Sequence, residues 1–515
     1  MDWHLLQHVG GETYQLHELI REFFREKLEG LTQASNFKQS IATCMATLAR
    51  DISDTPSGQI TQSIIETVPH LTEVAETIDQ SQFNETLCWL YVGLARFYNG
   101  QGFYTLVEKW CEQGLSIIRE RFNIDIDKIA DTDSTLKEVI AVLWLFQGKA
   151  LRVKGEYSLA LEKYQQSIEI LQDVQEKTMV VRALRGQGHV YRLQGKHKDS
   201  IRNYEESRRL AEVIKFDKGV ARAAYGVARI YRLRGELEKA ALRYEEARVG
   251  FEKLGLPVEE AWATFGLGEV QRMRWILQQS YEMYSAALQQ FKELGHREGE
   301  AYAVWGTGDT NRLLGGIEAE KGNLETALKY LETAKKDYEL SLEICQQIAD
   351  RRSEAWAVLG LAEVSRMEGK YEVSASEKAI SKYHDALSKY QRVFSLVSYQ
   401  ECVEEAHALL GIAATKRLLG LQGIISDLGM EINEACEKAI NIYQDQNRNM
   451  NYCIVDALIE RGLYHLIQLN WEQAQLDLEK AENICNDNNY TEEKALINRI
   501  KTKKDSSELH ILNFP

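Results

Sequence analysis

The stretch GQGHVYRLQGK, residues 186–196, has close copies along the chain. They read GVARIYRLRGE at 226–236, GLGEVQRMRW at 266–275 and GTGDTNRLLGG at 306–316. The small residue at the third position and the arginine at the seventh each recur every forty residues, a step that reaches back to Gly148 and Arg152. A fixed period near forty residues is typical of stacked supersecondary units, none of which buries its apolar face alone. The sequence therefore predicts a repeat array.

The composition is that of a folded chain built from helices. The 515 residues suffice for about three or four domains or one long array, and 44% hydrophobic with 27% charged residues is ordinary for globular proteins. Only four prolines, scarce strand-like alternation and apolar residues at helical spacing predict an almost entirely α-helical chain. The formal net charge of −15 argues against a nucleic-acid-binding surface as the overall role.

The cysteines and the start of the sequence bear on the compartment. The eight cysteines are scattered, without CxxC pairs or His and Cys spacings that suit zinc. We interpret them as small buried side chains in a reducing compartment and expect a cytoplasmic protein. The sequence contains no run of about eighteen apolar residues, and its start lacks the basic-then-apolar pattern of a signal peptide. We therefore expect neither a membrane nor a nucleic acid as a partner.

Each repeat has a fixed internal order of small and aromatic residues. Counting from Gly188, Tyr191 follows at three, Gly195 at seven, Ser200 at twelve and Tyr204 at sixteen. Small residues let two antiparallel helices approach, aromatic residues fill the space between them, and the middle glycine ends the first helix in a left-handed cap. This pattern resembles the tetratricopeptide repeat in its forty-residue form. The resemblance implies an all-α fold, a right-handed superhelical solenoid that binds proteins or peptides.

The expected organisation follows from where this pattern is regular. The resemblance covers roughly residues 85–490, with insertions at 315–353 and 369–403 that should lengthen helices or loops, and with Trp275 in place of a turn glycine. The expected domains are an N-terminal segment and linker at 1–84, a degenerate first repeat and linker at 85–138, about seven to eight repeats at 139–490, and a tail at 491–515.

The N-terminal segment carries a second resemblance. Residues 3–8 and 13–16 are expected to form a short hairpin around Gly10 and Gly11, followed by an amphipathic helix from His17. The phrase YQLHELIREF at 14–23 resembles the end of the winged-helix segment in STAND-type signalling ATPases. There, helical linkers and then repeats follow the ATPase module. A bare hairpin and helix is the alternative interpretation.

The tetratricopeptide resemblance also indicates where a ligand would bind. In that family the first helix of each repeat lines a concave groove, and its groove positions map onto four columns of this sequence. The candidate ligand-binding residues from these columns are Lys149, Arg152, Arg182, Arg185, His189, Arg192, Arg229, Arg232, Trp262, Phe265, Tyr302, Trp305 and Trp356.

The neighbours of the arginine column divide it into two parts. Later repeats place an acidic residue three positions before the arginine, within reach on one helix face. These are Glu269, Asp309 and Glu363 before Arg272, Arg312 and Arg366. Earlier repeats place Lys149, His189 and Arg229 there instead, before Arg152, Arg192 and Arg232. We expect an early groove that is basic and unpaired and a later one that is aromatic, which suits an acidic and apolar peptide.

A purely structural interpretation competes with this one. An arginine in the last turn of a helix is favoured by the helix dipole, so the column could brace successive repeats. Tryptophan and tyrosine at helical spacing are also often core residues. The glycines at 186, 226, 266, 306, 360 and 411 remove side chains from the first helix, so that either a ligand or a neighbouring helix can approach closely.

The remaining motifs do not support catalysis. The GxG pairs recur in mid-helix rather than after a strand, no GxxxxGK[ST] occurs, and HELIR at 17–21 has arginine where a zinc protease needs its second histidine. We find no nucleophile with a nearby base, and we expect no cofactor, no metal and no enzymatic activity. Two hypotheses remain: the sensor region of a STAND-type switch, with a separate ATPase module as a further partner, or a free-standing repeat scaffold or peptide receptor.

Overall fold

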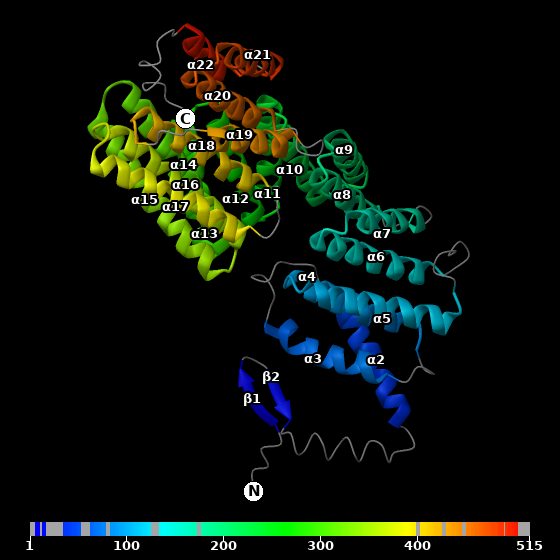
Figure 1. Ribbon diagram of the computed structural model, residues 1–515. Helices are drawn as coiled ribbons and strands as arrows, with labels where there is room; N and C mark the ends of the chain where they lie inside the picture. The colour runs from blue at the N-terminus through cyan, green and yellow to red at the C-terminus, as the bar shows by residue number, and fades with distance from the viewer. Residues whose placement is uncertain are drawn as a thin grey trace. The chain divides into compact units, whose positions relative to one another are not determined.

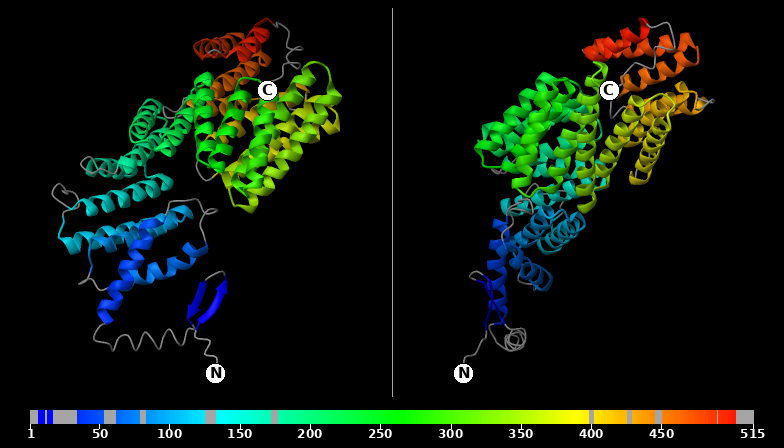
Figure 2. Two further views of the ribbon diagram at one scale, coloured as in Figure 1. Left: turned by 180° about the vertical axis from the view of Figure 1, so that it is seen from behind. Right: turned by 90° about the vertical axis from the view of Figure 1, so that its left-hand side faces the viewer.

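The protein is described by a computed structural model, shown in Figures 1 and 2. The described residues are 6–10, 13–16, 34–52, 62–78, 83–124, 133–171, 177–397, 402–424, 429–444, 450–488 and 490–502. They divide between two compact units, Met1–Val190 and Tyr191–Pro515.

The first unit begins with the expected hairpin. Strands β1 (Leu6–Gly10) and β2 (Thr13–Leu16) pair antiparallel, with Leu6 opposite Leu16 and an irregularity between His8 and Gly10. The expected helix from His17, together with Trp3 and Gly11, lies outside the described residues. The helices of this unit are α2 (Ala34–Asp51), α3 (Gln62–Thr77), the 3₁₀ turn η3 (Glu85–Cys88), α4 (Trp89–Gly100), α5 (Tyr104–Phe122), α6 (Ser134–Lys154), α7 (Tyr157–Ile170) and most of α8 (Lys177–Leu193).

The second unit continues as helical hairpins. Its regular helices have 17 residues each: α9 (His197–Val213), α10 (Asp217–Leu233), α11 (Leu237–Lys253), α12 (Pro257–Met273) and α13 (Leu277–Glu293). The expected insertions lengthen the next helices, α14 (Arg297–Glu320), α15 (Leu324–Gln347), α16 (Arg351–Tyr371) and α17 (Glu377–Leu396), to between 20 and 24 residues. The last helices are α18 (Val403–Leu421), α19 (Gly429–Gln444), α20 (Asn451–Ile467), α21 (Trp471–Asn488) and α22 (Thr491–Thr502).

These helices confirm the predicted all-α solenoid. In the second unit each helix packs on the next one in the chain, and the first helices of successive repeats, α10, α12, α14, α16, α18 and α20, also pack on each other. Among the described residues, the second helices α11, α13, α15, α17 and α19 contact the second helices of neighbouring repeats less than the first helices contact one another. Because the first helices are the closer set, they form the inner, concave layer of this unit. Figure 1 shows the stack of α12 to α18.

The turn between the two helices of a repeat has the expected left-handed residue. Gly195 and Gly235 have φ of 68° and 73°, and the Gly235 amide donates to the carbonyl of Arg232 at 3.0 Å. Trp275 adopts the same conformation, with φ of 58° and the same hydrogen bond to Arg272. A residue with a Cβ costs about 1–2 kcal/mol in this region, so the turn is maintained against local strain.

The repeated first-helix glycines accommodate tyrosine rings from the preceding second helix. A Cβ at Gly226 would lie 2.5 Å from the ring of Tyr204, and one at Gly266 would lie 2.4 Å from the ring of Tyr244. The other glycine and tyrosine pairs are Gly186 with Tyr164, Gly306 with Tyr284, Gly360 with Tyr338 and Gly411 with Tyr390. The glycines therefore admit a neighbouring helix, one of the two roles expected for them.

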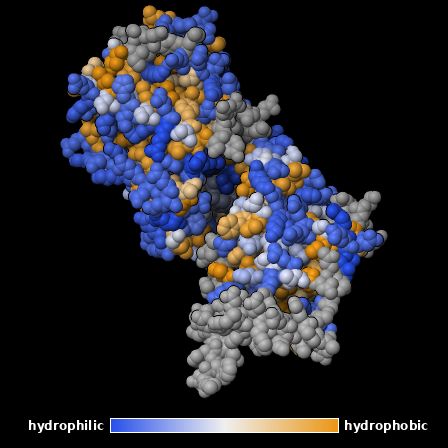
Figure 3. Space-filling view, turned by 60° about the horizontal axis from the view of Figure 1, so that its bottom comes forward, coloured by the Kyte–Doolittle hydropathy of each residue, from blue (hydrophilic) through white to orange (hydrophobic). Residues whose placement is uncertain are grey.

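The surface and the cysteines fit this packing. Figure 3 shows hydrophilic side chains over much of the face drawn, with hydrophobic ones interspersed. Six cysteines are buried, as expected, whereas Cys402 is partly exposed and Cys44 is exposed. None of the helices in the described part of the chain combines the length and the hydropathy that crossing a bilayer requires.

Candidate ligand-binding groove

The concave layer of the second unit presents a stripe of partly exposed side chains. On α10, α12 and α14 every third or fourth residue is partly exposed, while the residues between are mostly buried. Predicted site residues on this stripe are Arg229, Arg232, Trp262, Phe265, Tyr302 and Trp305, joined by Trp356 on α16 and by Arg192 at the end of α8. Their exposure allows contact with a ligand, although each ring also packs against neighbours.

The other predicted residues belong to the first unit. Lys149 and Arg152 lie on α6, and Arg182, Arg185 and His189 lie on α8, all partly exposed. Within the described part of the chain, the Arg152 side chain makes no hydrogen bond or ion pair. This agrees with the sequence, in which Lys149 stands where later repeats have an acidic residue three positions before the arginine.

The arginine column of the second unit forms an alternating ladder with carboxylates. Arg232 Nη1 lies 2.8 Å from Glu269 Oε2 of the next repeat, so the expectation that Arg232 lacks a carboxylate partner is wrong. Arg272 lies 3.6 Å from Glu269 in its own helix and 3.1 Å from Asp309 in the next repeat. Arg312 lies 2.8 Å from Asp309. Each of these carboxylates thus joins two arginines across a repeat boundary.

The ladder extends through the longer repeats. Arg366 pairs with Glu363 three residues before it, which confirms the predicted in-helix pairs. Arg417 Nη2 donates to Glu460 Oε2 at 2.9 Å, and the Nε of Arg417 binds the other oxygen of Glu460. Both residues of this last pair are buried. Arg232, Arg272 and Arg417 therefore pair with a carboxylate of the next repeat, as the bracing interpretation expects, whereas Arg312 and Arg366 pair within their own helices.

Tyrosine hydroxyl groups hold the ladder carboxylates in place. Tyr284 donates to Glu269 at 2.7 Å, Tyr338 donates to Asp309 at 3.1 Å, and Tyr390 donates to Glu363. These are the tyrosines whose rings lie against the repeated glycines. Burial alone would raise the pKa of Glu269, but the guanidinium groups of Arg232 and Arg272 and the Tyr284 hydroxyl keep that pKa below its usual value.

Arg229 interrupts this pattern. It holds the position on α10 that Glu269 holds on α12 and Asp309 on α14. Its guanidinium carbon lies 6.0 Å from the centre of the Tyr225 ring, and within the described part of the chain it has no ion pair. The carboxylate series therefore ends at Glu269, and the α10 end of the groove carries an extra cation beside Arg232.

The aromatic side chains beyond it form two groups of rings in contact. The ring centre of Trp262 lies 5.7 Å from that of Phe265 and 5.5 Å from that of Tyr302. The ring centres of Trp305 and Trp356 lie 6.0 Å apart, and the Trp305 indole nitrogen donates to the carbonyl of Trp356 at 3.3 Å. Edge-to-face contacts of this kind fix the rings while leaving part of each surface free for apolar groups.

Three sets of contacts were not predicted from the sequence. Arg222 pairs with Glu259 at 2.7 Å, and the Trp356 indole nitrogen donates to Glu404 at 3.0 Å. The Tyr490 hydroxyl lies 3.0 Å from where a Cβ of Gly235 would be, which brings the start of α22 to the α10–α11 turn. The inter-repeat pairs did have a signal, since Arg222 and Glu259, Arg232 and Glu269, and Arg272 and Asp309 are each separated by 37 residues.

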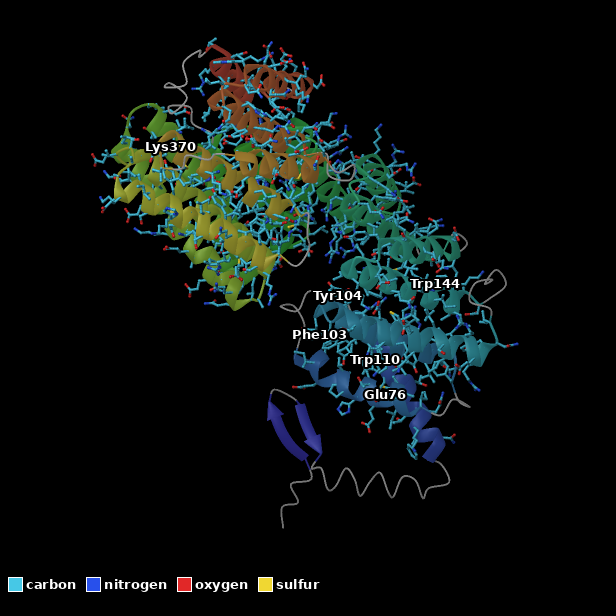
Figure 4. All side chains as sticks on the ribbon, viewed as in Figure 1. Glu76, Phe103, Tyr104, Trp110, Trp144 and Lys370 are labelled. Atoms are coloured by element: carbon cyan, nitrogen blue, oxygen red, sulfur yellow. The ribbon has the colours of Figure 1, made fainter. Side chains whose placement is uncertain are left out.

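Within the described residues no group of three or more His, Cys, Asp or Glu side chains is arranged to hold a metal ion. One unusual cation lies near the end of helix α16: burial, with Arg366 and Arg417 nearby, lowers the pKa of Lys370 to about 7. Figure 4 labels this residue on α16.

Comparison with known proteins agrees with the repeat architecture. Residues 139–212 and 179–253 match the family model of the tetratricopeptide repeat. No curated protein sequence matches the chain.

Several solved structures resemble the chain in fold. The apo form of RapI is 13% identical, with 80% of this chain and 97% of that chain covered and a TM-score of 0.50. A Rap protein complexed with Competence and Sporulation Factor is 12% identical, with 88% and 99% covered and a TM-score of 0.44. The STAND protein with a tetratricopeptide repeat sensor, PH0952 from Pyrococcus horikoshii, is 13% identical, with 86% and 58% covered and a TM-score of 0.44. At such identities the likeness concerns the fold.

Proposed function

We propose that this chain is the sensor or interaction module of a signalling or defence system, and that the concave layer of its second unit binds an acidic and apolar segment of a protein or peptide. The observation that carries the proposal is Arg229. It stands where the following repeats have a carboxylate, it has no ion pair among the described residues, and it lies beside Arg232 and Tyr225. A carboxylate of the ligand would supply the anion that the chain itself supplies in later repeats.

The chemistry of such a ligand follows from the two ends of the stripe. A guanidinium group binds a carboxylate through two parallel N–H donors, which gives direction as well as affinity. Next along the stripe, Trp262, Phe265 and Tyr302 offer partly exposed rings, and rings of this kind anchor apolar side chains in many interfaces. The expected segment therefore has acidic residues at the α10 end and leucine or aromatic residues toward α16.

A binding titration tests this proposal. The probe is a fluorescent extended peptide with three acidic residues followed by leucine and phenylalanine, and the controls are its scrambled and acid-to-amide forms. Arg229→Glu should weaken binding of the probe by roughly ten- to a hundredfold, since a charged hydrogen bond contributes about 1.5–3 kcal/mol and reversal adds repulsion. Affinity should also fall with salt because exposed charges are screened over about 10 Å at 0.1 M.

Two variants provide controls for charge reversal. Arg312→Glu changes an arginine that already pairs with Asp309, and Arg248→Glu changes one on the second helix α11, where it pairs with Glu245. Arg248→Glu should bind the probe nearly as well as the parent chain. Arg312→Glu sets a second carboxylate beside Asp309, so it serves as a control once circular dichroism shows that the variant is folded. The basic subsite would be contradicted if Arg229→Glu and Arg248→Glu lost the same amount of affinity for the probe. It would also be contradicted if the acidic peptide and its amide form bound equally well.

The link to a signalling ATPase is a further part of the proposal. It rests on the resemblance of residues 14–23 to the winged-helix end of STAND-type proteins. If it holds, an ATPase reading frame should lie near the gene, and its product should co-purify with this chain. Absence of both would favour the second candidate, a free-standing scaffold or peptide receptor, and would leave the groove proposal intact.

A further inference from the structure

The turn between α10 and α11 contacts a residue from the last repeat of the second unit. A Cβ on Gly235 would lie 3.0 Å from the hydroxyl oxygen of Tyr490 and 3.3 Å from its Cε1 atom. Other glycines with positive φ lie in open turns, where a Cβ would meet no atom of the described residues within 4 Å; these are Gly102, Gly155, Gly255, Gly295, Gly322 and Gly423. The contact at Gly235 is therefore specific to this turn.

Tyr490 is fixed by its own repeat. It immediately precedes α22, and its backbone amide donates to the carbonyl of Cys485 on α21 at 3.0 Å. Its ring centre lies 5.8 Å from that of Tyr452 on α20, with the two ring planes at 79°. Edge-to-face pairs of this kind favour one orientation of the rings. Helices α20 to α22 therefore present the hydroxyl end of Tyr490 to the α10–α11 turn.

Helix α20 also lies close to α12. Burial raises the pKa of Tyr452 well above its usual value, and Arg272 on α12 opposes that rise. Burial raises the pKa of the neighbouring Cys453 thiol as well, again with Arg272 acting against the rise. Because the effect of a charge falls off with distance, α20 and α12 lie near each other. The last repeat has therefore returned to the repeats of α10 to α12.

The contact between these repeats, distant in sequence, is small. Helix α20 packs mainly on α18, α19 and α21, and α22 packs on α21, so contacts from these helices onto α10 to α12 are few among the described residues. A stable interface buries about 1,200–2,000 Å² in total, and one tyrosine ring on a turn buries far less. The contact is therefore weak enough to open while the repeats on either side stay folded.

We propose that Tyr490 and Gly235 form a clasp that closes the concave layer of the second unit into a ring, and that opening of this clasp controls the entry of the ligand. With the clasp closed, a ligand reaches Arg229 and the aromatic rings only through the two ends of the ring. With the clasp open, an extended segment also enters from the side. The control of entry rests on the proposed function, whereas the clasp itself does not.

Distances between spin labels on α11 and α21 test the clasp without any ligand. The labels are attached at Leu242→Cys and Leu476→Cys, because these side chains are 69% and 45% exposed. Cys44 and Cys402, which are exposed and partly exposed, are changed to serine so that they take up no label. The parent chain should give one narrow distribution of distances between the two labels.

Two variants open the clasp from opposite sides. Tyr490→Ala removes the ring, and Gly235→Trp fills the space that the ring occupies; both should broaden the distribution toward longer distances. Trp275 holds the corresponding turn of the next repeat with φ of 58°, so a tryptophan is compatible with this backbone. The matched control is Gly255→Trp, since Gly255 has φ of 61° and a Cβ there would meet nothing within 4 Å.

The control should give the same distribution as the parent chain. A distribution that stays narrow in Gly235→Trp overturns the clasp, even where Tyr490→Ala changes it, because Tyr490→Ala also removes the contact with Tyr452. Circular dichroism of each variant checks that the helices remain.

Stopped-flow binding of the fluorescent acidic peptide tests the control of entry. Tyr490→Ala and Gly235→Trp should both raise its association rate constant, roughly tenfold, because the open form becomes the main one. Gly255→Trp should leave the rate unchanged. Equal rates in all variants, with the label distances changed, would overturn the control of entry. A peptide that binds to no form of the chain would instead contradict the groove, and the label distances would still decide the clasp.

Discussion

Glu269 connects two repeats, accepting a hydrogen bond from Arg232 of the preceding repeat at 2.8 Å while lying 3.6 Å from Arg272 of its own helix. The residue is 8% exposed, so its charge is largely removed from water and depends on these arginines. The Tyr284 hydroxyl donates to the same carboxylate at 2.7 Å. This one side chain therefore holds three helices together.

Removing this charge should destabilise the second unit. Glu269→Gln leaves Arg232 and Arg272 with fewer counter-charges in a partly buried position, and breaking such a pair typically costs about 3–5 kcal/mol. We expect the lower end of that range because both guanidinium groups retain some contact with water. Urea unfolding followed by circular dichroism measures the loss. Glu325→Gln, which breaks an exposed pair with Lys329, should change stability by less than about 1 kcal/mol.

The ladder also shows how far sequence reasoning reaches. The pairs of Arg312 with Asp309 and Arg366 with Glu363 follow from a step of three residues on one helix, and both were predicted. The pair of Arg232 with Glu269 does not follow from spacing within one helix, because the partner lies on the next first helix. For the glycine and tyrosine contacts, the sequence predicted the repeated glycines but not the tyrosine rings that pack against them. Periodicity identifies the glycine, but the direction of the ring that fills its place depends on the packing of two helices.

A methyl group at one of the repeated glycines should be costly. Gly266→Ala would place a Cβ 2.4 Å from the ring of the buried Tyr244, so the ring or the helix must move. Overpacking of this kind costs about 1–3 kcal/mol. Gly316→Ala is the control, since its nearest neighbour is the end of the flexible Met367 side chain at 3.4 Å. There the helix should gain up to about 1 kcal/mol, because alanine is the better helix former. Similar unfolding midpoints for both variants would contradict this explanation.

His407 should make stability depend on pH. Burial, with a contribution from Arg272, lowers its pKa to about 4 from a usual value of 6.5. The unfolded chain therefore binds a proton that the folded chain does not between these values. The stabilising contribution is complete above about pH 6.5 and is lost as the pH falls toward 4, by up to about 1.4 kcal/mol per pH unit.

Replacing the histidine isolates this effect. His407→Phe keeps a ring next to Trp356 and Tyr443, which lie 5.1 and 5.4 Å from it, and removes the titration. The free energy of unfolding of the variant should change less between pH 6.5 and 5 than that of the parent chain. The carboxylates nearby, Glu404 and Glu363, have lowered pKa values and stay ionised in this range. Parallel curves for both proteins would assign the dependence to other groups.

Lys370 should be unusually reactive near neutral pH. With its pKa lowered to about 7 by burial and by Arg366 and Arg417, about half of its amine is neutral at pH 7, whereas an ordinary lysine has almost none. Carbamylation by cyanate, followed by peptide mass spectrometry, should modify Lys370 roughly ten times faster than the exposed Lys329. In denaturant the two rates should converge. A slower reaction at Lys370 in the folded protein would show that access outweighs the neutral amine.

The glycine and tyrosine contacts also define the unit in which this array can be shortened or extended. Each ring and the glycine that receives it belong to neighbouring repeats, so a cut made at a repeat boundary separates a fitted pair. A deletion of forty residues with both ends inside first helices, such as 227–266, would instead bring Gly226 into the place of Gly266 and set Arg192 in the place of Arg232, opposite Glu269. The exchangeable module of this protein is therefore the forty-residue segment from the middle of one first helix to the middle of the next.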